Sequence, residues 1–260
     1  MPPLPALTNW DSTRMTLHQA AQVLGAIREF QATPQPNYHH LPLIVTPNSL
    51  RSGLLPVGGE LVLDFNRAHI TYTCPADTCS TIPLSGHTQT SLAAAVLEAM
   101  AKTGHPAEPS LANFNGTHPL VIDRIQATDY ASALYRVFTA LARVRARLNG
   151  SQTALVVWPH GFDLSGLWFH RGFDEAADPH INIGFSPGSP GIGRPYVYLY
   201  AWPQPPGWTN LSLPELAHWH EQNWTGVVIP YDSLAPLPNP EAKLEDLLET
   251  VIKAVQEVMT

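Results

Sequence analysis

The chain of 260 residues has few charged side chains, and it lacks both long apolar runs and runs of like charge. Asp, Glu, Lys and Arg make up 13% of it, about half of the usual share. The formal net charge of -7 is spread along the sequence, which argues against a surface for nucleic acid or for an anionic membrane. No window approaches the roughly 18 apolar residues of a membrane helix, and MPPLPALTNW lacks the charged and apolar regions of a signal peptide. We therefore expect a soluble, cytoplasmic protein with no nucleic-acid or membrane partner.

Cysteine is nearly absent, because Cys74 and Cys79 are the only two in the chain. A pair of thiols supplies half of a zinc site and cannot form a disulfide framework. The two residues, in TYTCPADTCST, could close a small loop, bind a metal with ligands from elsewhere, or flank a turn. The Pro-Ala-Asp between two strand-like runs favours a hairpin turn. The redox state of the pair stays open.

Proline, in contrast, is abundant, with 26 residues, about twice the average frequency. Prolines divide a chain into short elements joined by loops. The 44% of hydrophobic residues excludes a disordered chain. A chain of this length can bury about 70% or more of its unfolded surface, as one large domain or two small ones.

The first half of the sequence predicts a helix, four strands and a second helix. The first helix is expected from Ser12 to Gln31, with Asp11 or Ser12 as its cap. The strands are expected in HHLPLIVT, ELVLDF, HITYTC and STIPL. The second helix is expected from Thr90 to Lys102, because Gly104 and a proline follow it.

The second half predicts the same order of elements. A helix is expected from Tyr130 to Leu148, with Gly150 after it. Strands are expected in TALVVW, HINIGF, PYVYLYAW and GVVIPY. A last helix, with Asn239 as its cap and Pro240 in its first position, ends the half.

Two local similarities indicate an internal duplication. IVTPNSLRSGLLP aligns with VVWPHGFDLSGLWF, so that Ser52-Gly53-Leu54 meets Ser165-Gly166-Leu167, and Ile82-Pro83-Leu84 meets Ile229-Pro230-Tyr231. We expect a single compact unit over residues 1–260, with related halves at about 12–104 and 129–259 joined by a loop at 105–128. The expected fold class is α+β, with helices packed on a mostly antiparallel sheet.

One segment, VVWPHGFDLSGLWFHRGF, gathers histidines, an aspartate and aromatic residues between Val156 and Phe173. The duplication explains why this segment forms a strand, a bend, a tight turn and a second strand. It does not explain the presence of His160 and Asp163, which the first half lacks. These two lie close enough in a bend for the carboxylate to orient the imidazole, which would suit general acid or base catalysis. Alternatively, Asp163 caps a turn, as aspartates in loops usually do. No nucleophile is specified, because Ser165 belongs to the repeated Ser-Gly turn.

Aromatic residues are concentrated in the second half, where six of the seven tryptophans follow residue 150. In PYVYLYAW the aromatic residues alternate with Val197, Leu199 and Ala201, so that one face of this strand is aromatic. That face belongs either to a sheet buried on both sides or to the wall of a ligand cavity. The predicted ligand-binding residues are Trp158, Phe162, Trp168, Tyr198, Tyr200 and Trp202.

The other histidine pairs are weaker candidates. His39 and His40 are neighbours at a strand entry, so at most one can face a given cavity. His218 and His220 have a spacing that would place two metal ligands on one side of a strand, with Glu221 close by. A metal needs three or four donors. We therefore predict no metal site, and whether His218 and His220 bind a metal stays open.

Several motifs resemble a bacterial family catalogued as domain of unknown function 5996. They are NYHHLPLIVT, GFDLSGLWF, INIGFSPG, YVYLYAWPQPPG and VVIPY, in the family's order from Trp10 to the last helix. The resemblance places His40 and Asp163 on family positions, whereas His160 stands where members often have a small residue. Ser186 replaces a tryptophan of the family pattern and Gln204 replaces a glutamate. The family label implies no activity.

We predict that the protein binds a small organic molecule in an aromatic-lined cleft, between the halves or at the sheet surface, with Asp163 and His40 as polar contributors. One alternative is an enzyme with acid/base or hydrolytic chemistry that uses Asp163 with His160 or His40. Another is a protein-interaction module that presents residues 202–224 as a flat aromatic patch. The sequence identifies no ligand, cofactor or oligomeric state.

Overall fold

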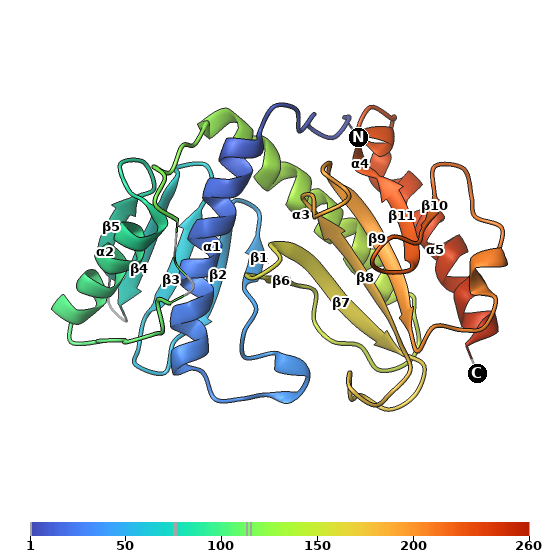
Figure 1. Cartoon of the computed structure of the whole chain (residues 1–260), viewed down its shortest axis with the longest axis horizontal. Coiled ribbons are helices and arrows are strands. Elements are labelled where there is room, and N and C mark those ends of the chain that lie inside the picture. The colour runs from blue at the N-terminus through green and yellow to red at the C-terminus, as the bar shows by residue number, and fades with distance from the viewer. Residues whose placement is uncertain (1, 75–76, 113, 115, 260) are drawn as a thin grey trace. The chain divides into compact units, whose positions relative to one another are not determined.

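The computed structural model describes residues 2–74, 77–112, 114 and 116–259 (Figure 1). Contacts between Cα atoms divide the chain into two compact units. We call Leu7–Ser132 with Val157–Phe162 the first-sheet unit, and Met1–Ala6 with Ala133–Val156 and Asp163–Thr260 the second-sheet unit. Each unit contains an antiparallel sheet and helices, which confirms the predicted α+β class.

The first sheet is an antiparallel meander with the order β1-β2-β3-β4-β5. Burial alternates along β3, because Leu61 and Leu63 point to the covered side. α1 packs on β2 and β3, and α2 packs on β4 and β5 (Figure 1). The elements of this unit are α1 (Asp11–Gln31), η1 (Pro36–Tyr38), β1 (Ile44–Thr46), β2 (Ser49–Leu54), β3 (Glu60–Asp64), β4 (His69–Cys74), β5 (Asp77–Pro83) and α2 (Gln89–Lys102).

The two helices of this unit begin and end close to the expected residues. α1 begins at Asp11 and ends at Gln31, and the expected cap at Asp11 or Ser12 is wrong, because the N-cap is Trp10 and both residues lie inside the helix. α2 begins at Gln89, because the Thr88 hydroxyl accepts a hydrogen bond from the backbone N–H of Ser91 and the Ser91 hydroxyl accepts one from the backbone N–H of Thr88. This reciprocal capping fixes the start of the helix one residue before the expected position.

The second sheet has the order β10-β11-β9-β8-β7-β6, and the pairs from β10 to β7 are antiparallel. α3 starts in the first-sheet unit and continues into the second-sheet unit at Ala133. The elements from here on are α3 (Arg124–Ala146), β6 (Val156–Trp158), β7 (Asp163–Phe169), β8 (His180–Ser186), β9 (Tyr196–Trp202), η2 (Trp208–Asn210), β10 (His218–His220), β11 (Gly226–Pro230), α4 (Tyr231–Leu234) and α5 (Pro240–Val258). Val157 and Trp158 of β6 count with the first-sheet unit.

α3 begins at Arg124, earlier than the expected Tyr130. The cause is Asp123, whose carboxylate accepts hydrogen bonds from the backbone N–H groups of Ile125 and Gln126. The expected connecting loop 105–128 is therefore shorter in the structure and ends before Arg124. The prediction missed this cap because the apolar periodicity of the helix starts only one turn later.

The second sheet is buried on both faces along its central strands. All residues of β8 are buried, and so are most of β9. One face carries the apolar residues Ile181, Ile183, Phe185, Val197, Leu199 and Ala201. The other, which we call the polar–aromatic face, carries His180, Asn182, Gly184, Tyr196, Tyr198 and Tyr200. The predicted alternation of aromatic and aliphatic residues in β9 is confirmed.

Helices cover the apolar face of the second sheet. The guanidinium of Arg145, near the end of α3, lies over Gly166 of β7, because a Cβ atom at that glycine would be 3.1 Å from Nη1. α3 and α5 lie side by side, joined by ion pairs from Arg143 and Arg147 to Glu245. α4 contacts β9 and β11. α5 begins with Pro240, as expected.

The two sheets share a strand order. The first runs β1-β2-β3-β4-β5 and the second runs β6-β7-β8-β9-β11, with β10 added beside β11. A helix precedes each meander and another follows it. A duplication would produce this similarity. The duplication and the single compact unit over residues 1–260 nevertheless stay predictions.

Within the described ranges, no helix has both the length and the apolar composition needed to cross a membrane.

Candidate functional site

Three tyrosines of β9 form a row on the polar–aromatic face. The ring centroids of Tyr196 and Tyr198 are 5.9 Å apart, and those of Tyr198 and Tyr200 are 6.2 Å apart. The cross-strand register places Gly184 opposite Tyr198 and Asn182 opposite Tyr200. The tyrosine row therefore has small and polar neighbours on β8.

Gly184 leaves the space that the Tyr198 side chain occupies. A Cβ atom at Gly184 would lie 2.5 Å from Tyr198 Oη and 2.5 Å from the carbonyl oxygen of Leu164. Because this space is open, the tyrosine crosses β8, and its hydroxyl donates a hydrogen bond to Asp163 Oδ2 at 2.5 Å. Because Gly184 of β8 has no side chain, Tyr198 of β9 can reach Asp163, the first residue of β7.

The electrostatics of this pair keep the proton on the tyrosine. Burial raises the pKa of Tyr198 well above its ordinary value, and the negative charge of Asp163 raises it further. At neutral pH the phenol is therefore a hydrogen-bond donor and the carboxylate its acceptor. Since Tyr198 is 8% exposed, the arrangement fixes the position of the Asp163 carboxylate.

Asn182 and Tyr200 form a second hydrogen bond on the same face. The Asn182 Nδ2 group donates to Tyr200 Oη at 2.8 Å, and burial raises the pKa of Tyr200. Asn182 is 7% exposed, and its Oδ1 atom has no hydrogen-bond partner among the described residues. Buried amide oxygens usually have a partner. This face therefore contains one unused acceptor.

Trp224 lies against the tyrosine row. A Cβ atom at Gly226 would be 2.5 Å from Trp224 Cζ3, so this glycine provides the space for the indole. The ring centroid of Trp224 lies 6.5, 6.1 and 6.3 Å from those of the three tyrosines in chain order, and 4.6 Å from that of His220. The indole of Trp224 therefore lies beside both the tyrosine row of β9 and His220 of β10.

A pocket of about 370 Å³ opens beside β10, within the roughly 300–1,000 Å³ of small-molecule sites. We call it the β10 pocket. It is lined by residues 191–192, 194–196, 218–222, 228 and 230. Tyr196 contributes an aromatic ring, and its hydroxyl is 2.7 Å from Ser189 Oγ. Arg194 is held by two hydrogen bonds of 2.8 Å to the carboxylate of Asp232.

His218 and His220 both contribute to the β10 pocket. They are two residues apart on a strand, so their side chains point to the same side, which is the side of the buried Val228 opposite His218. The His220 ring donates from Nε2 to the carbonyl oxygen of Gln222 at 2.7 Å. The described part of the chain has no group of three or more His, Cys, Asp or Glu side chains that could hold a metal.

The residues predicted for acid/base chemistry are divided between the two units. Asp163 belongs to the second-sheet unit, and His160 and His40 belong to the first-sheet unit. His40 Nδ1 accepts a hydrogen bond from the backbone N–H of Gln35 at 3.1 Å. The backbone carbonyl of His160 accepts one from His18 Nε2 at 2.9 Å. Catalysis by Asp163 with either histidine stays a prediction.

The predicted cleft residues of the second-sheet unit occupy three environments. Tyr198 and Tyr200 lie on the polar–aromatic face. Trp202, at the end of the same strand, is 41% exposed and stacks on His180 at 5.6 Å. Trp168 is paired with Ile181 in the sheet register and therefore lies on the apolar face, where its indole N–H donates to a backbone carbonyl at 2.7 Å.

The other two predicted cleft residues lie in the first-sheet unit. Phe162 is 1% exposed and stacks on His18, with ring centroids 5.4 Å apart. Trp158 meets the ring of His39 edge-on at 6.0 Å. Their role in ligand binding stays a prediction, and the structure gives Phe162 a place in the core.

In the segment 202–224, predicted as a possible interaction surface, Trp208 is buried, Trp219 and Trp224 are half-buried, and Trp202 is exposed. Trp208 is 3% exposed, and its ring meets that of Trp219 at 5.0 Å. The indole of Trp219 donates to the carbonyl oxygen of Leu211 at 3.2 Å. Presentation of residues 202–224 to a protein partner stays a prediction.

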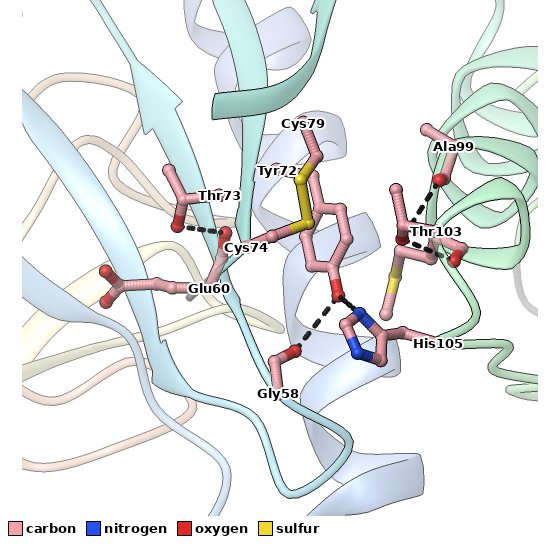
Figure 2. Close-up of a disulfide and its surroundings, with 10 residues drawn as sticks. Gly58, Glu60, Tyr72, Thr73, Cys74, Cys79, Ala99, Thr103 and His105 are labelled. Atoms are coloured by element: carbon pink, nitrogen blue, oxygen red, sulfur yellow. Dashed lines mark hydrogen bonds between the residues drawn. A yellow bond between two sulfur atoms is a disulfide. The ribbon is translucent and has the colours of Figure 1, made fainter. Parts of the chain in front are cut away.

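The two cysteines lie on the neighbouring strands β4 and β5 of the first-sheet unit, which pair as a hairpin. Figure 2 shows a disulfide between Cys74 and Cys79, whose Cα atoms are 5.8 Å apart. Beside it, Tyr72 Oη is 2.6 Å from His105 Nδ1 and donates to the carbonyl oxygen of Gly58 at 3.0 Å. The hairpin that the sequence favoured is confirmed by the pairing of β4 with β5, and the disulfide closes the loop between the two cysteines.

Sequence reasoning missed the residues that shape the site. Gly184 was part of a family motif and Gly226 the first residue of an expected strand, but neither was recognised as space for an aromatic ring. A glycine inside a strand pattern is a signal for close approach of another group. Trp224 was named only as the end of a segment, because no periodicity connects it with β9.

Comparison with known proteins adds a family but no activity. The model of a family of unknown function (DUF5996) matches residues 1–259. The comparisons with curated proteins and with solved structures found no significant match. The match covers nearly the whole chain and agrees with the motifs around Asp163 and β9. The chain therefore belongs to the DUF5996 family of unknown function.

Proposed function

We propose that the protein binds a small organic molecule in the β10 pocket. The observation that supports this proposal most is the combination of an apolar wall, from Tyr196, Val228 and Ile192, with the imidazoles of His218 and His220. Small-molecule sites commonly combine apolar and aromatic walls with a few placed polar groups. The proposed ligand has a planar or apolar body and a polar group that pairs with the imidazoles.

The surrounding face supports the same proposal. Tyr196 stacks on Trp224 at 6.5 Å with an interplanar angle of 19°, and Val228 is paired with Tyr198 in the sheet register. The predicted ligand-binding residues Tyr198 and Tyr200 are thus neighbours of the pocket wall. In this proposal they keep Tyr196 and Trp224 in place rather than form the pocket themselves.

The proposal can be tested with ligand-observed NMR and a fragment library of planar carboxylic acids, amides and heteroaromatic amines. Hits are then compared between the wild type and the His218→Ala/His220→Ala double variant, with His118→Ala as the control because His118 is an exposed histidine of the first-sheet unit. We expect a class of fragments whose affinity falls about tenfold or more in the double variant and is unchanged in the control. Equal binding to all three proteins, or no binding to the wild type, would refute the proposal.

A further inference from the structure

The first-sheet unit contains an arginine without a counterion. Arg28 lies in the last turn of α1, and its side chain has no hydrogen bond or ion pair with the described residues; its Nε atom is buried without a partner. Burial lowers the pKa of the guanidinium, with no carboxylate to oppose the effect. A guanidinium carries five N–H donors, so this one has its hydrogen-bonding capacity unused.

The guanidinium of Arg28 lies close to a glycine of the first sheet, which leaves space for it. A Cβ atom at Gly53 of β2 would be 3.1 Å from Arg28 Nη1 and 3.4 Å from Ile44 Cδ1. The φ angle of Gly53 is +71°, a conformation that other residues rarely adopt. Ile44 is 47% exposed. The guanidinium therefore lies beside an accessible apolar side chain.

Gln31 adds a second unsatisfied group. It lies three residues after Arg28 on α1, a spacing that makes the two side chains neighbours on the helix surface. Both its Nε2 and its Oε1 atoms are buried and have no hydrogen-bond partner in the described part of the chain. Such groups are rare in folded proteins, and here two occur one helical turn apart.

The second-sheet unit shows that the fold does not require this arrangement. Arg145 also lies in the last turn of a helix, and its Nη1 atom is also 3.1 Å from the Cβ position of a glycine, Gly166. There, however, Nε donates to Gln152 Oε1 at 3.1 Å and Nη2 donates to the carbonyl oxygen of Thr153. Both arginines thus lie against a glycine. The guanidinium of Arg145 donates to protein acceptors, whereas that of Arg28 has no acceptor among the described residues.

We infer that Arg28 and Gln31 bind the carboxylate or phosphate group of a small organic anion whose apolar part lies on Ile44. The planar fork of a guanidinium matches the two oxygens of such a group. The amide of Gln31 supplies an additional donor, and Ile44 supplies apolar contact. This site is in the first-sheet unit and does not depend on the β10 pocket.

The first experiment observes Arg28 directly in the unmodified protein. The side-chain Nε–Hε NMR signals of the arginines are recorded during titrations with sodium acetate, sodium hexanoate and inorganic phosphate at constant ionic strength, and Arg28→Lys identifies the signal of Arg28. We expect a saturable shift of this signal, and no saturable shift of the Arg145 signal. Hexanoate stronger than acetate would confirm the apolar contact, and phosphate stronger than both would identify a phosphoryl ligand.

The second experiment compares Arg28→Met with Arg145→Met by thermal unfolding. Without an added anion, Arg28→Met should unfold about 2–4 °C higher than the wild type, because it removes a desolvated charge that has no partner. Arg145→Met should unfold at a lower temperature, because it removes two hydrogen bonds. The anions should raise the unfolding temperature of the wild type and of Arg145→Met more than that of Arg28→Met.

Two results would overturn the inference. One is the absence of a saturable Arg28 signal shift with all three anions. The other is an equal anion-dependent rise of the unfolding temperature in the wild type and in Arg28→Met, which would show a general salt effect. Arg28→Lys provides a second variant if Arg28→Met does not fold, because it keeps the charge and loses the two-pronged geometry.

Discussion

The central strands of the two sheets differ in how many of their faces are buried. β3 of the first sheet alternates between half-buried and buried residues, whereas every residue of β8 in the second sheet is buried. A strand with one covered face needs only apolar residues on that face. In the second sheet the additional buried face contains tyrosines, an asparagine and an aspartate, each of which needs hydrogen-bond partners. In the second-sheet unit, these hydrogen-bonded polar side chains therefore lie on the polar–aromatic face.

The two units also differ in the titratable groups that they bury. In the second-sheet unit, burial raises the pKa values of Tyr198 and Tyr200. In the first-sheet unit, burial lowers the pKa values of His18 and His69 and raises that of Tyr72. The first kind of shift weakens a fold in alkaline solution and the second weakens it in acid. The acid dependence of stability can therefore test the histidines of the first-sheet unit, whereas the alkaline dependence tests Tyr198 only by comparison with a variant that lacks its hydroxyl.

The largest effect is expected from a methyl group at Gly184. Gly184→Ala would place a Cβ atom against the Tyr198 hydroxyl and the Leu164 carbonyl, and we expect a loss of about 3 kcal/mol in the free energy of unfolding. Urea unfolding measures the loss. Gly193→Ala is the control, because nothing lies within 4 Å of the added atom, and it should change stability by less than about 0.5 kcal/mol. Equal stability of the two variants would contradict the packing described for the polar–aromatic face.

A smaller effect is expected from the hydroxyl of Tyr198. Tyr198→Phe leaves the Asp163 carboxylate without this donor, and we expect a loss of about 1.5–3 kcal/mol in the free energy of unfolding at neutral pH. Tyr135→Phe, elsewhere in the same unit, is the control. In a double-mutant cycle with Asp163→Asn, the two losses should not be additive. Additive losses would show that the hydrogen bond does not stabilise the sheet.

Tyr198→Phe should also change how the stability of the protein depends on pH in alkaline solution. The pKa of Tyr198 is higher in the folded state than in the unfolded state, so its contribution is complete below about pH 10, the pKa of an unfolded tyrosine. It is lost as the pH rises above that value, because the unfolded chain then releases its proton first. We expect the stability of Tyr198→Phe to fall less steeply above pH 10 than that of the wild type.

The smallest effect is expected in the first-sheet unit, at His18. Burial is the largest cause that lowers the pKa of His18, so the neutral ring is favoured in the folded state. Its contribution to stability is complete above about pH 6.5, the unfolded value, and is lost as the pH falls below it. His18→Gln keeps a donor for the His160 carbonyl and removes the titration. Urea unfolding at pH 7 and at pH 5 should show a smaller acid loss for this variant than for the wild type, and an identical loss would contradict the assignment.

The sequence predicted the elements with strong periodicity and missed those that depend on single contacts. The helices α1, α2 and α5 and the alternation in β9 follow from apolar spacing and from caps. The early start of α3 depends on one carboxylate at Asp123, and the short α4 carries no periodic signal. Periodicity describes one element at a time, whereas these features arise from individual contacts.

The site was predictable in part for the same reason. The tyrosine row and Asp163 were recognisable, because strand alternation and a polar residue in an aromatic segment are visible in one stretch of sequence. Their pairing was not, since it depends on Gly184, which comes 21 residues after Asp163 and 14 before Tyr198. The β10 pocket likewise combines residues that are distant in the sequence, from Ile192 to Val228. A glycine in a strand is visible in the sequence, but the side chain that fills the space beside it is not.

The interleaving of the two units has a consequence for how the protein is made. The second-sheet unit is built from three segments of the chain and the first-sheet unit from two, the last of which ends at Phe162. A ribosome that has finished α2 has therefore not yet supplied all of the first-sheet unit, and the second-sheet unit combines residues before α1 with the chain from Ala133 to α5. Neither unit corresponds to a fragment that one truncation can isolate, and residues 2–6 can complete their unit only once α5 has been synthesised.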